Sequence, residues 1–202
     1  MKQMGTICVR DIEEPAIDKG EILRYAGVYG AGSDIESLVD DCIREVSGRL
    51  RYKVVYTVLP VISDEEGISL GNIRSSSRSM IKALRGCSYC AVFAATVGLE
   101  TDRLIARYAA ISPSRSLIFS AIGTERIESL CNAFCDQLGQ EMADAGHKIR
   151  PRFSAGYGDI PLELQKNIFE LLDCQRRIGL TLNESLLISP TKSVTAFVGI
   201  TV

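Results

Sequence analysis

The sequence predicts a mixed α/β or α+β fold, and three observations support this. Stretches with helical periodicity alternate with extended stretches along the chain, which is typical of such folds. Hydrophobic residues make up 46% and charged residues 24% of the 202 residues, an ordinary globular composition. No internal repeat, low-complexity tract or Pro/Ser-rich linker is present, so residues 1–202 are expected to form one domain.

The first elements with recognisable boundaries are a helix and a strand. Ser33 and Glu36 have the spacing of a capping box, which predicts an amphipathic helix that ends near Gly48. The next segment, Lys53–Ile62, is β-branched and aromatic and therefore predicts a strand. Within it, Pro60 indicates either an edge strand or the end of the strand.

A short helix and a buried strand are expected next. The Ser77–Leu84 segment predicts a short helix, which is expected to end with Gly86 as its C′ residue. Tyr89–Val97 is continuously apolar, which indicates a central strand that is covered on both faces.

A long helix is predicted to begin at Ser112 and Pro113, as N-cap and first-turn proline, and to end at Gly146. Its apolar residues recur at steps of four or eight and form one stripe. They are Ile118, Ile122, Leu130, Phe134, Leu138 and Met142.

The last predicted elements are a helix and a strand. The helix runs from about Pro161 to Arg177, with Asp159 as its cap and Gly179 as its terminator. The final strand spans Ser193–Val202.

Charge and cysteine content argue against several classes of protein. A net charge of −2 without a basic stripe gives no support for binding to nucleic acid or to an anionic membrane. No apolar run has the roughly 18 residues that a membrane helix requires. The first residues carry charges, such as Arg10 and Glu13, where a signal peptide needs an apolar core. Seven cysteines, an odd number, favour a reducing cytoplasm over a secreted disulfide framework.

The segment with the most informative chemistry is Arg150–Asp159, RPRFSAGYGD. Its glycines allow a ligand to approach the backbone closely, and the helix start that follows favours a carboxylate or phosphate. An arginine offers a bidentate fork for a carboxylate, and the Tyr157 ring offers a face for an adenine or a cation. The alternative interpretation is a strand-to-helix turn with solvated arginines.

Four collinear stretches resemble the activation domain of cobalamin-dependent methionine synthase. RFSAGYGDIPLELQKNIFELLD resembles the family's Arg-x-x-x-Gly-Tyr motif and following helix, and FAATVGLETDRLIARY resembles its Phe-Ala-x-Thr-x-Gly-Leu-Glu strand and helix. NAFCDQL is similar to part of the family's next helix, and IGLTLNESLLISPTKSVTAFVGI resembles its ending. The stronger resemblance covers 89–202. The looser one over 1–88 is carried by LRYAGVYG, which is similar to the standalone form of the family.

This resemblance implies a twisted, largely antiparallel β-sheet with flanking helices that binds S-adenosylmethionine (AdoMet). In the family, the domain presents AdoMet for the reductive methylation of inactive cob(II)alamin, which restores methionine biosynthesis. The reaction needs no general base or covalent nucleophile from the domain, because methyl transfer from a sulfonium to Co(I) relies on positioning.

The resemblance also implies an AdoMet site. Arg152 matches the motif arginine and would form a salt bridge with the AdoMet carboxylate, while Gly156 and Tyr157 match the closing pair of the motif. Ser154 and Ala155 belong to the same loop and would contribute backbone contacts. Asp136 falls where the family's helix carries an acidic residue, which would contact the ligand's amino group or ribose; otherwise it is a solvent-facing carboxylate.

The implied partners follow from what the sequence does not contain. It has no recognisable cobalamin, zinc or homocysteine module, so the chain is expected to act on a cobalamin-binding methionine synthase or another corrinoid protein. A flavodoxin- or ferredoxin-type protein would supply the electron. The chain is therefore interpreted as a component of a methyltransferase rather than a complete enzyme. The alternatives are a non-catalytic AdoMet sensor, an assembly subunit for a corrinoid methyltransferase, and a purely structural interaction protein.

The cysteines and the single histidine suggest weaker alternatives. Cys87 and Cys90, together with Cys131 and Cys135, have local spacings compatible with a four-thiolate metal site, and Cys87 and Cys90 with a redox pair. Free cysteines are commonly small buried hydrophobic residues, which is the interpretation we favour. His147 follows the long helix and is expected at a cap or on the surface. No metal site is predicted.

Overall fold

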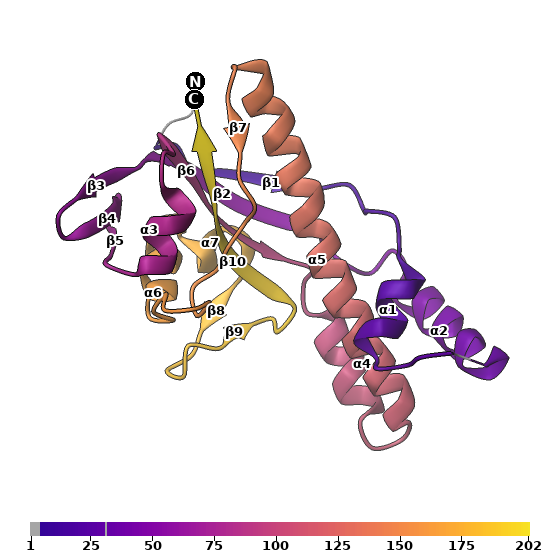
Figure 1. The fold of residues 1–202 in the computed structure, drawn as a ribbon. Helices are drawn as coiled ribbons and strands as arrows, with labels where there is room; N and C mark the ends of the chain where they lie inside the picture. The colour runs from indigo at the N-terminus through magenta and orange to yellow at the C-terminus, as the bar shows by residue number, and fades with distance from the viewer. Residues whose placement is uncertain (1–4, 31) are drawn as a thin grey trace.

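A five-stranded antiparallel sheet forms the centre of the structure, a computed structural model that describes residues 5–30 and 32–202 (Figure 1). The strand order is β1-β2-β6-β10-β7, and every neighbouring pair is antiparallel. The strands are β1 (Cys8–Asp11), β2 (Lys53–Pro60), β6 (Tyr89–Thr96), β10 (Ser193–Thr201) and β7 (Lys148–Ile149). The flanked, largely antiparallel sheet implied by the resemblance is thus present.

Alternation of side chains along the strands divides the core into two layers. Cys90 and Val92 of β6 face one layer, whereas Ala91 and Phe93 face the other, because successive residues of a strand point to opposite faces. The first layer is covered by the helices α3 (Arg78–Leu84), α6 (Leu164–Leu172) and α7 (Cys174–Ile178). The second is covered by the C-terminal half of α5 (Pro113–Asp144).

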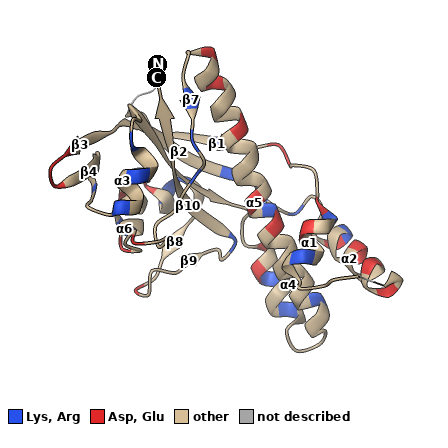
Figure 2. Ribbon diagram, in the orientation of Figure 1, with Lys and Arg blue, Asp and Glu red and all other residues tan. Residues whose placement is uncertain are grey.

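The N-terminal half of α5 extends beyond the sheet and is the centre of a helical cluster (Figure 1). Around it pack α1 (Lys19–Tyr25), α2 (Ser33–Val46) and α4 (Glu100–Tyr108). Within the cluster, the Tyr108 and Phe119 rings stack with centroids 5.4 Å apart. One continuous helix therefore joins the sheet to the cluster. Acidic and basic side chains are interspersed on the helices of this cluster (Figure 2).

Two small sheets complete the fold. Strands β3 (Ile62–Asp64), β4 (Gly67–Leu70) and β5 (Ile73–Ser75) form an antiparallel meander. Strands β8 (Thr181–Leu182) and β9 (Ile188–Ser189) form a hairpin before β10. The sequence patterns predicted neither sheet, since strands of two to four residues are too short to show a period.

Most of the longer predicted elements are confirmed. The Tyr89–Val97 strand is the central β6, which lies between β2 and β10 and is buried on both faces. Pro60 is the last residue of β2, so it marks the strand end rather than a sheet edge. The long helix begins at Pro113 after Ser112, and the chain turns at Gly146 with a φ of 81°.

Two predicted boundaries are wrong. Gly32 rather than Ser33 is the N-cap of α2, and no side chain caps that helix, so the capping box does not form. The single helix expected over Pro161–Arg177 is two helices, α6 and α7. They are separated at Asp173, whose left-handed φ of 49° interrupts the helical path.

A buried ion pair on α5 anchors the segment that leads from β1 to α1. Glu125 and Arg126 are 2% and 1% exposed and form an ion pair. Arg126 also donates to the carbonyl oxygens of Pro15 and Ala16, at 2.6 and 2.7 Å, and the backbone N–H of Asp18 donates to Glu125 at 3.3 Å. These contacts give both buried charges partners within the protein.

We expect Arg126→Ala to lower the free energy of unfolding by about 3–5 kcal/mol, because it leaves the buried Glu125 charge without its partner. Urea denaturation at neutral pH measures the change. Arg44→Ala is the control, because the Arg44 side chain is 77% exposed and its loss is expected to change stability by less than about 1 kcal/mol. If the two substitutions lowered the free energy of unfolding equally, the buried Glu125–Arg126 ion pair would not have the stabilising role expected of it.

Candidate functional site

The candidate site lies at the edge of the central sheet, where residues 148–153 run beside β10. The Arg150 N–H donates to the Gly199 carbonyl at 2.8 Å, and Phe153 and Phe197 exchange two backbone hydrogen bonds of 3.0 and 2.7 Å. Ile149 pairs with Ile200, so the five residues 149–153 of the edge segment lie opposite the four residues 197–200 of β10. The segment therefore contains one extra residue, as in a β-bulge, next to Arg152.

Arg152 points to the α5 side of this edge. Its guanidinium donates to the Asn132 Oδ1 atom and the Glu128 Oε2 atom, each at 2.5 Å. The next residue, Phe153, points to the opposite side and stacks on Phe197 with ring centroids 5.3 Å apart. The Arg152 side chain is 23% exposed. It is thus held in place while part of its surface stays accessible.

Glu128 and Asn132 belong to a polar row on α5 that also contains Ser120 and Thr124, each four residues from the next. The Lys192 Nζ atom donates to the Ser120 and Thr124 hydroxyls at 3.1 and 2.9 Å. Burial lowers the pKa of Lys192, although the charge of Asp102 opposes this shift. Two cations, Lys192 and Arg152, therefore lie along one polar row.

The loop after Arg152 brings its backbone close to neighbouring side chains. Gly156 has a φ of 82° and donates its N–H to the Ile160 carbonyl at 3.0 Å. A Cβ atom at Gly156 would lie 3.0 Å from the Leu162 side chain, so glycine suits both the conformation and the space. Ala155 is 9% exposed and packs in the core layer that α3 covers. The Ser154 carbonyl accepts from the Tyr157 N–H at 3.3 Å.

Tyr157 is exposed to solvent, with 73% of its surface accessible. It borders a hollow of about 360 Å³ on the α3 side of the sheet edge, lined also by Ser79, Lys82 and Phe153. Arg152 does not line this hollow, because it points to the α5 side. The two principal residues of the motif therefore face different sides of one edge segment.

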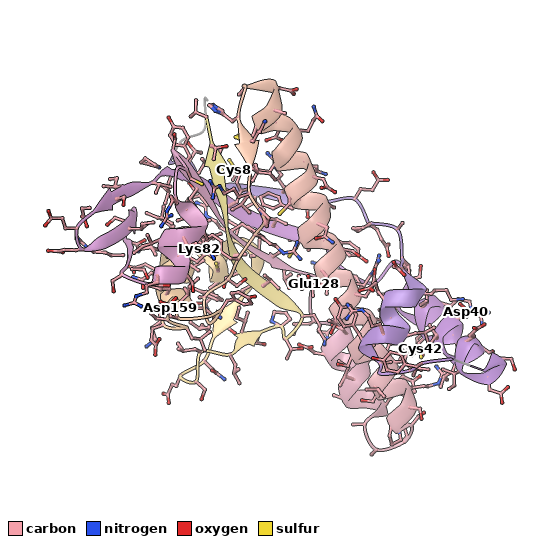
Figure 3. The ribbon with its side chains drawn as sticks, viewed as in Figure 1. Cys8, Asp40, Cys42, Lys82, Glu128 and Asp159 are labelled. Carbon is pink, nitrogen blue, oxygen red and sulfur yellow. The ribbon has the colours of Figure 1, made fainter. Side chains whose placement is uncertain are left out.

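Asp159 fixes the end of this loop onto α3. Its carboxylate accepts hydrogen bonds from the Ser77 hydroxyl at 2.6 Å and from the Arg78 and Ser79 backbone N–H groups at 2.8 and 3.0 Å. These hydrogen bonds, first among them that from Ser77, hold the pKa of Asp159 well below its usual range. The prediction that Asp159 caps the following helix is wrong, because the carboxylate binds the N-terminus of α3. Figure 3 shows Asp159 beside α3 and Glu128 on α5.

The expected residues fall into three groups. Arg152 lies against α5, whereas Ser154, Ala155, Gly156 and Tyr157 form the loop near α3. Asp136 is exposed on α5, and Arg152 instead contacts Glu128 and Asn132 of that helix. Sequence reasoning missed Glu128 and Asn132; their i, i+4 spacing was visible, but nothing indicated that this face meets Arg152.

The two cysteine pairs lie on opposite faces of the sheet. Cys87 and Cys90 belong to the α3 layer, whereas Cys131 and Cys135 belong to the α5 layer, so the four cannot form one four-thiolate site. Burial raises the pKa of Cys131 to about 12 despite the nearby Arg152 charge, and burial also raises the pKa of Cys87. These cysteines are therefore neutral thiols near neutral pH.

Metal-binding clusters and membrane-spanning helices are both absent from residues 5–30 and 32–202. No cluster of three or more His, Cys, Asp or Glu side chains in these ranges is arranged to hold a metal ion. Nor does any helix within them combine the length and hydropathy required to cross a bilayer.

Comparison with known proteins identifies a family and similar solved structures. A family model described as "Vitamin B12 dependent methionine synthase, activation domain" matches residues 72–201. A crystal structure of the MetH reactivation domain bound to AdoHcy has a similar fold, with a TM-score of 0.65 and 16% identity. The similarity covers 98% of this chain and 78% of that one. No curated protein matches the sequence significantly.

The hydrogen bonds of Asp159 predict a pH-dependent contribution to stability. Because the folded-state pKa is depressed, ionised Asp159 stabilises the fold above its unfolded-state pKa of about 4, and this stabilisation is lost as pH falls towards the folded-state value. We expect Asp159→Asn to lower stability at neutral pH and to flatten its decline below about pH 4.

Urea unfolding of the wild-type protein and the variant over this pH range measures the effect. Asp136→Asn, at an exposed position on α5, is the control and should keep the wild-type pH profile. If Asp159→Asn had the same dependence of stability on pH as the wild type, the hydrogen bonds of Asp159 to the start of α3 would contribute no pH-dependent stability.

Proposed function

Because this chain belongs to the family of the vitamin B12-dependent methionine synthase activation domain, we propose that it binds AdoMet and supports reactivation of such an enzyme. The structural neighbour that is bound to AdoHcy supports a ligand of the same class. The proposed setting is the cytoplasm, where the chain would act on a cobalamin-binding methionine synthase or another corrinoid protein. A flavodoxin- or ferredoxin-type donor would supply the electron.

The single observation that carries this proposal is the arrangement of Arg152. A guanidinium has five N–H donors, and Arg152 directs them to Asn132, Glu128 and the Cys135 thiol, so donors remain for a ligand. Its side chain is also partly exposed, so a carboxylate can reach it. A bidentate pair with the AdoMet carboxylate fits this geometry. The contacts with α5 keep the guanidinium in position before the ligand binds, which reduces the entropic cost of binding.

The glycine loop supports the same ligand. The backbone of Ser154, Ala155 and Gly156 follows Arg152 directly, and exposed Tyr157 offers a ring face beyond it. We propose that an extended ligand lies along the sheet edge, with its amino-acid end at Arg152 and its remainder towards Tyr157. AdoMet would supply an activated methyl group on a positively charged sulfur. The residues of this chain would bind and orient it without taking part in proton transfer.

We expect Arg152→Ala to weaken AdoMet binding about 10- to 150-fold, which corresponds to the 1.5–3 kcal/mol of a charge-assisted hydrogen bond. Titration calorimetry with AdoMet and AdoHcy measures the change. Arg150→Ala is the matched control, since Arg150 lies in the same segment but points to the α3 side, with its Nη1 atom 3.5 Å from the Ala83 carbonyl. If the wild type and Arg152→Ala bound AdoMet with equal affinity, Arg152 would not be part of the AdoMet site.

The reactivation role needs a second measurement. In the presence of AdoMet, an electron donor and a cob(II)alamin-loaded partner protein, the chain should accelerate the formation of methylcobalamin, and Arg152→Ala should slow it. AdoMet binding without any such acceleration would contradict the reactivation role and support a non-catalytic AdoMet sensor. The absence of AdoMet binding would contradict both.

The acidic group that accompanies Arg152 is proposed to be Glu128. Its carboxylate lies beside Arg152, so the two charges match the zwitterionic amino-acid end of AdoMet, with Glu128 facing the ammonium group. The sequence predicted Asp136 in this role, but Asp136 is exposed, and Arg152 contacts Glu128 instead.

We therefore expect Glu128→Gln to weaken AdoMet binding about fivefold or more, the effect of losing a partly exposed charged contact. Asp136→Asn should change it less than twofold. Calorimetry on the two variants compares them directly. The reverse order of effects would restore Asp136 as the ligand's acidic partner, and tighter binding by Glu128→Gln would show that Glu128 competes with the ligand carboxylate.

A further inference from the structure

A second hollow lies between α4 and the segments that precede β2 and β10, and it shares no residue with the proposed AdoMet site. Its volume is about 410 Å³, within the range of small-molecule sites. Three arginines line it, from two separate parts of the chain: Arg49 and Arg51 before β2, and Arg103 on α4. The sole carboxylate among its lining residues is Glu100 at the start of α4.

The charges of this hollow are not balanced. Arg49 forms an ion pair with Glu100 and also donates to the Glu45 carbonyl at 3.1 Å, while Arg103 lies 3.6 Å from the same Glu100 carboxylate. One carboxylate is thus shared by two arginines. Among the described residues, the Arg51 guanidinium has no hydrogen-bonding or ionic partner, although its backbone N–H is fixed to the Val97 carbonyl at 3.1 Å. The hollow therefore has an excess of two positive charges in a chain of net charge −2.

The remaining walls are not uniformly polar. Leu99, Ile178 and Pro190 line the hollow beside the arginines, and Leu99 is 49% exposed. Gly98, which precedes the start of α4 with a φ of 84°, also lines the hollow. Guanidinium groups match the geometry of phosphate oxygens, and an apolar wall favours an organic body attached to the phosphate.

We propose that this hollow binds a small organic phosphate, with Arg51 and Arg103 on the phosphate oxygens and Leu99 and Pro190 against the organic part. This site goes beyond the proposed function, because none of its residues lies on the Arg152–Tyr157 edge. Arg49 stays paired with Glu100 and positions the start of α4. Electrostatic attraction makes a major contribution to binding, which therefore weakens as salt concentration rises.

Calorimetric titration of the full chain with ADP and with pyrophosphate at low ionic strength tests this proposal. We expect saturable one-to-one binding of both, at least fivefold tighter for ADP. Arg51→Ala and Arg103→Ala should each weaken ADP binding about tenfold, the effect of losing one charge-assisted hydrogen bond. Arg85→Ala, which removes the same charge from the exposed end of α3, should leave ADP binding unchanged.

Several outcomes would overturn the inference. They are the absence of saturable binding, an equal loss in Arg85→Ala, and ADP binding no tighter than pyrophosphate binding. AdoMet titrations separate this site from the proposed function. Arg51→Ala should bind AdoMet as the wild type does, and Arg152→Ala should bind ADP as the wild type does. If Arg51→Ala lost AdoMet affinity as well, the hollow would belong to the AdoMet site and not be a separate one.

Discussion

The arrangement of this protein depends on one constraint, the burial of both faces of a five-stranded antiparallel sheet. Because side chains alternate along each strand, β6 and β10 supply two core layers, one against α5 and the other against α3, α6 and α7. The edge segment 148–153 pairs with β10, but the extra residue of its bulge interrupts the alternation, so that Arg150 and Arg152 face opposite layers. Arg152 consequently faces α5, while Phe153 stacks on Phe197 in the other layer. The position of the candidate site therefore follows from the pleat of the sheet together with the bulge in its edge segment.

The course of the edge segment also explains why the site is extended rather than enclosed. Arg152 and Tyr157 belong to one short motif, yet they face different sides of the sheet edge, and the backbone of 154–156 connects them. The loop is held at both ends, by the Phe153–Phe197 backbone pair and by the hydrogen bonds of Asp159 to the start of α3. Fixed in this way, the segment from Arg152 to Tyr157 presents its backbone groups and side chains one after another along the sheet edge. Such a surface suits a long ligand better than a compact one.

The sequence was most informative where the periodic pattern was long or the terminating residue specific. The central β6, the 32-residue α5 and the end of β2 at Pro60 all follow from local patterns. The break at Asp173 did not, because a left-handed aspartate has no periodic signature. Asp159 was assigned to the nearest helix in sequence, but its carboxylate binds α3, about 80 residues earlier. Glu128 and Asn132 were missed for a related reason: only tertiary pairing brings their face of α5 to Arg152.

The arginines differ in how many of their hydrogen-bond donors are already used within the fold. Arg126 is 1% exposed and makes four hydrogen bonds, two to backbone carbonyls and two to Glu125, so its donors are almost fully used inside the fold. Arg152 contacts Asn132, Glu128 and the Cys135 thiol but remains partly exposed, and the side chain of Arg51 makes no hydrogen bond among the described residues. A guanidinium whose N–H donors are hydrogen-bonded within the protein has few donors left for a ligand, because these donors are limited in number and fixed in direction. We therefore expect unused donors, rather than positive charge alone, to distinguish the proposed binding arginines Arg152 and Arg51 from structural ones.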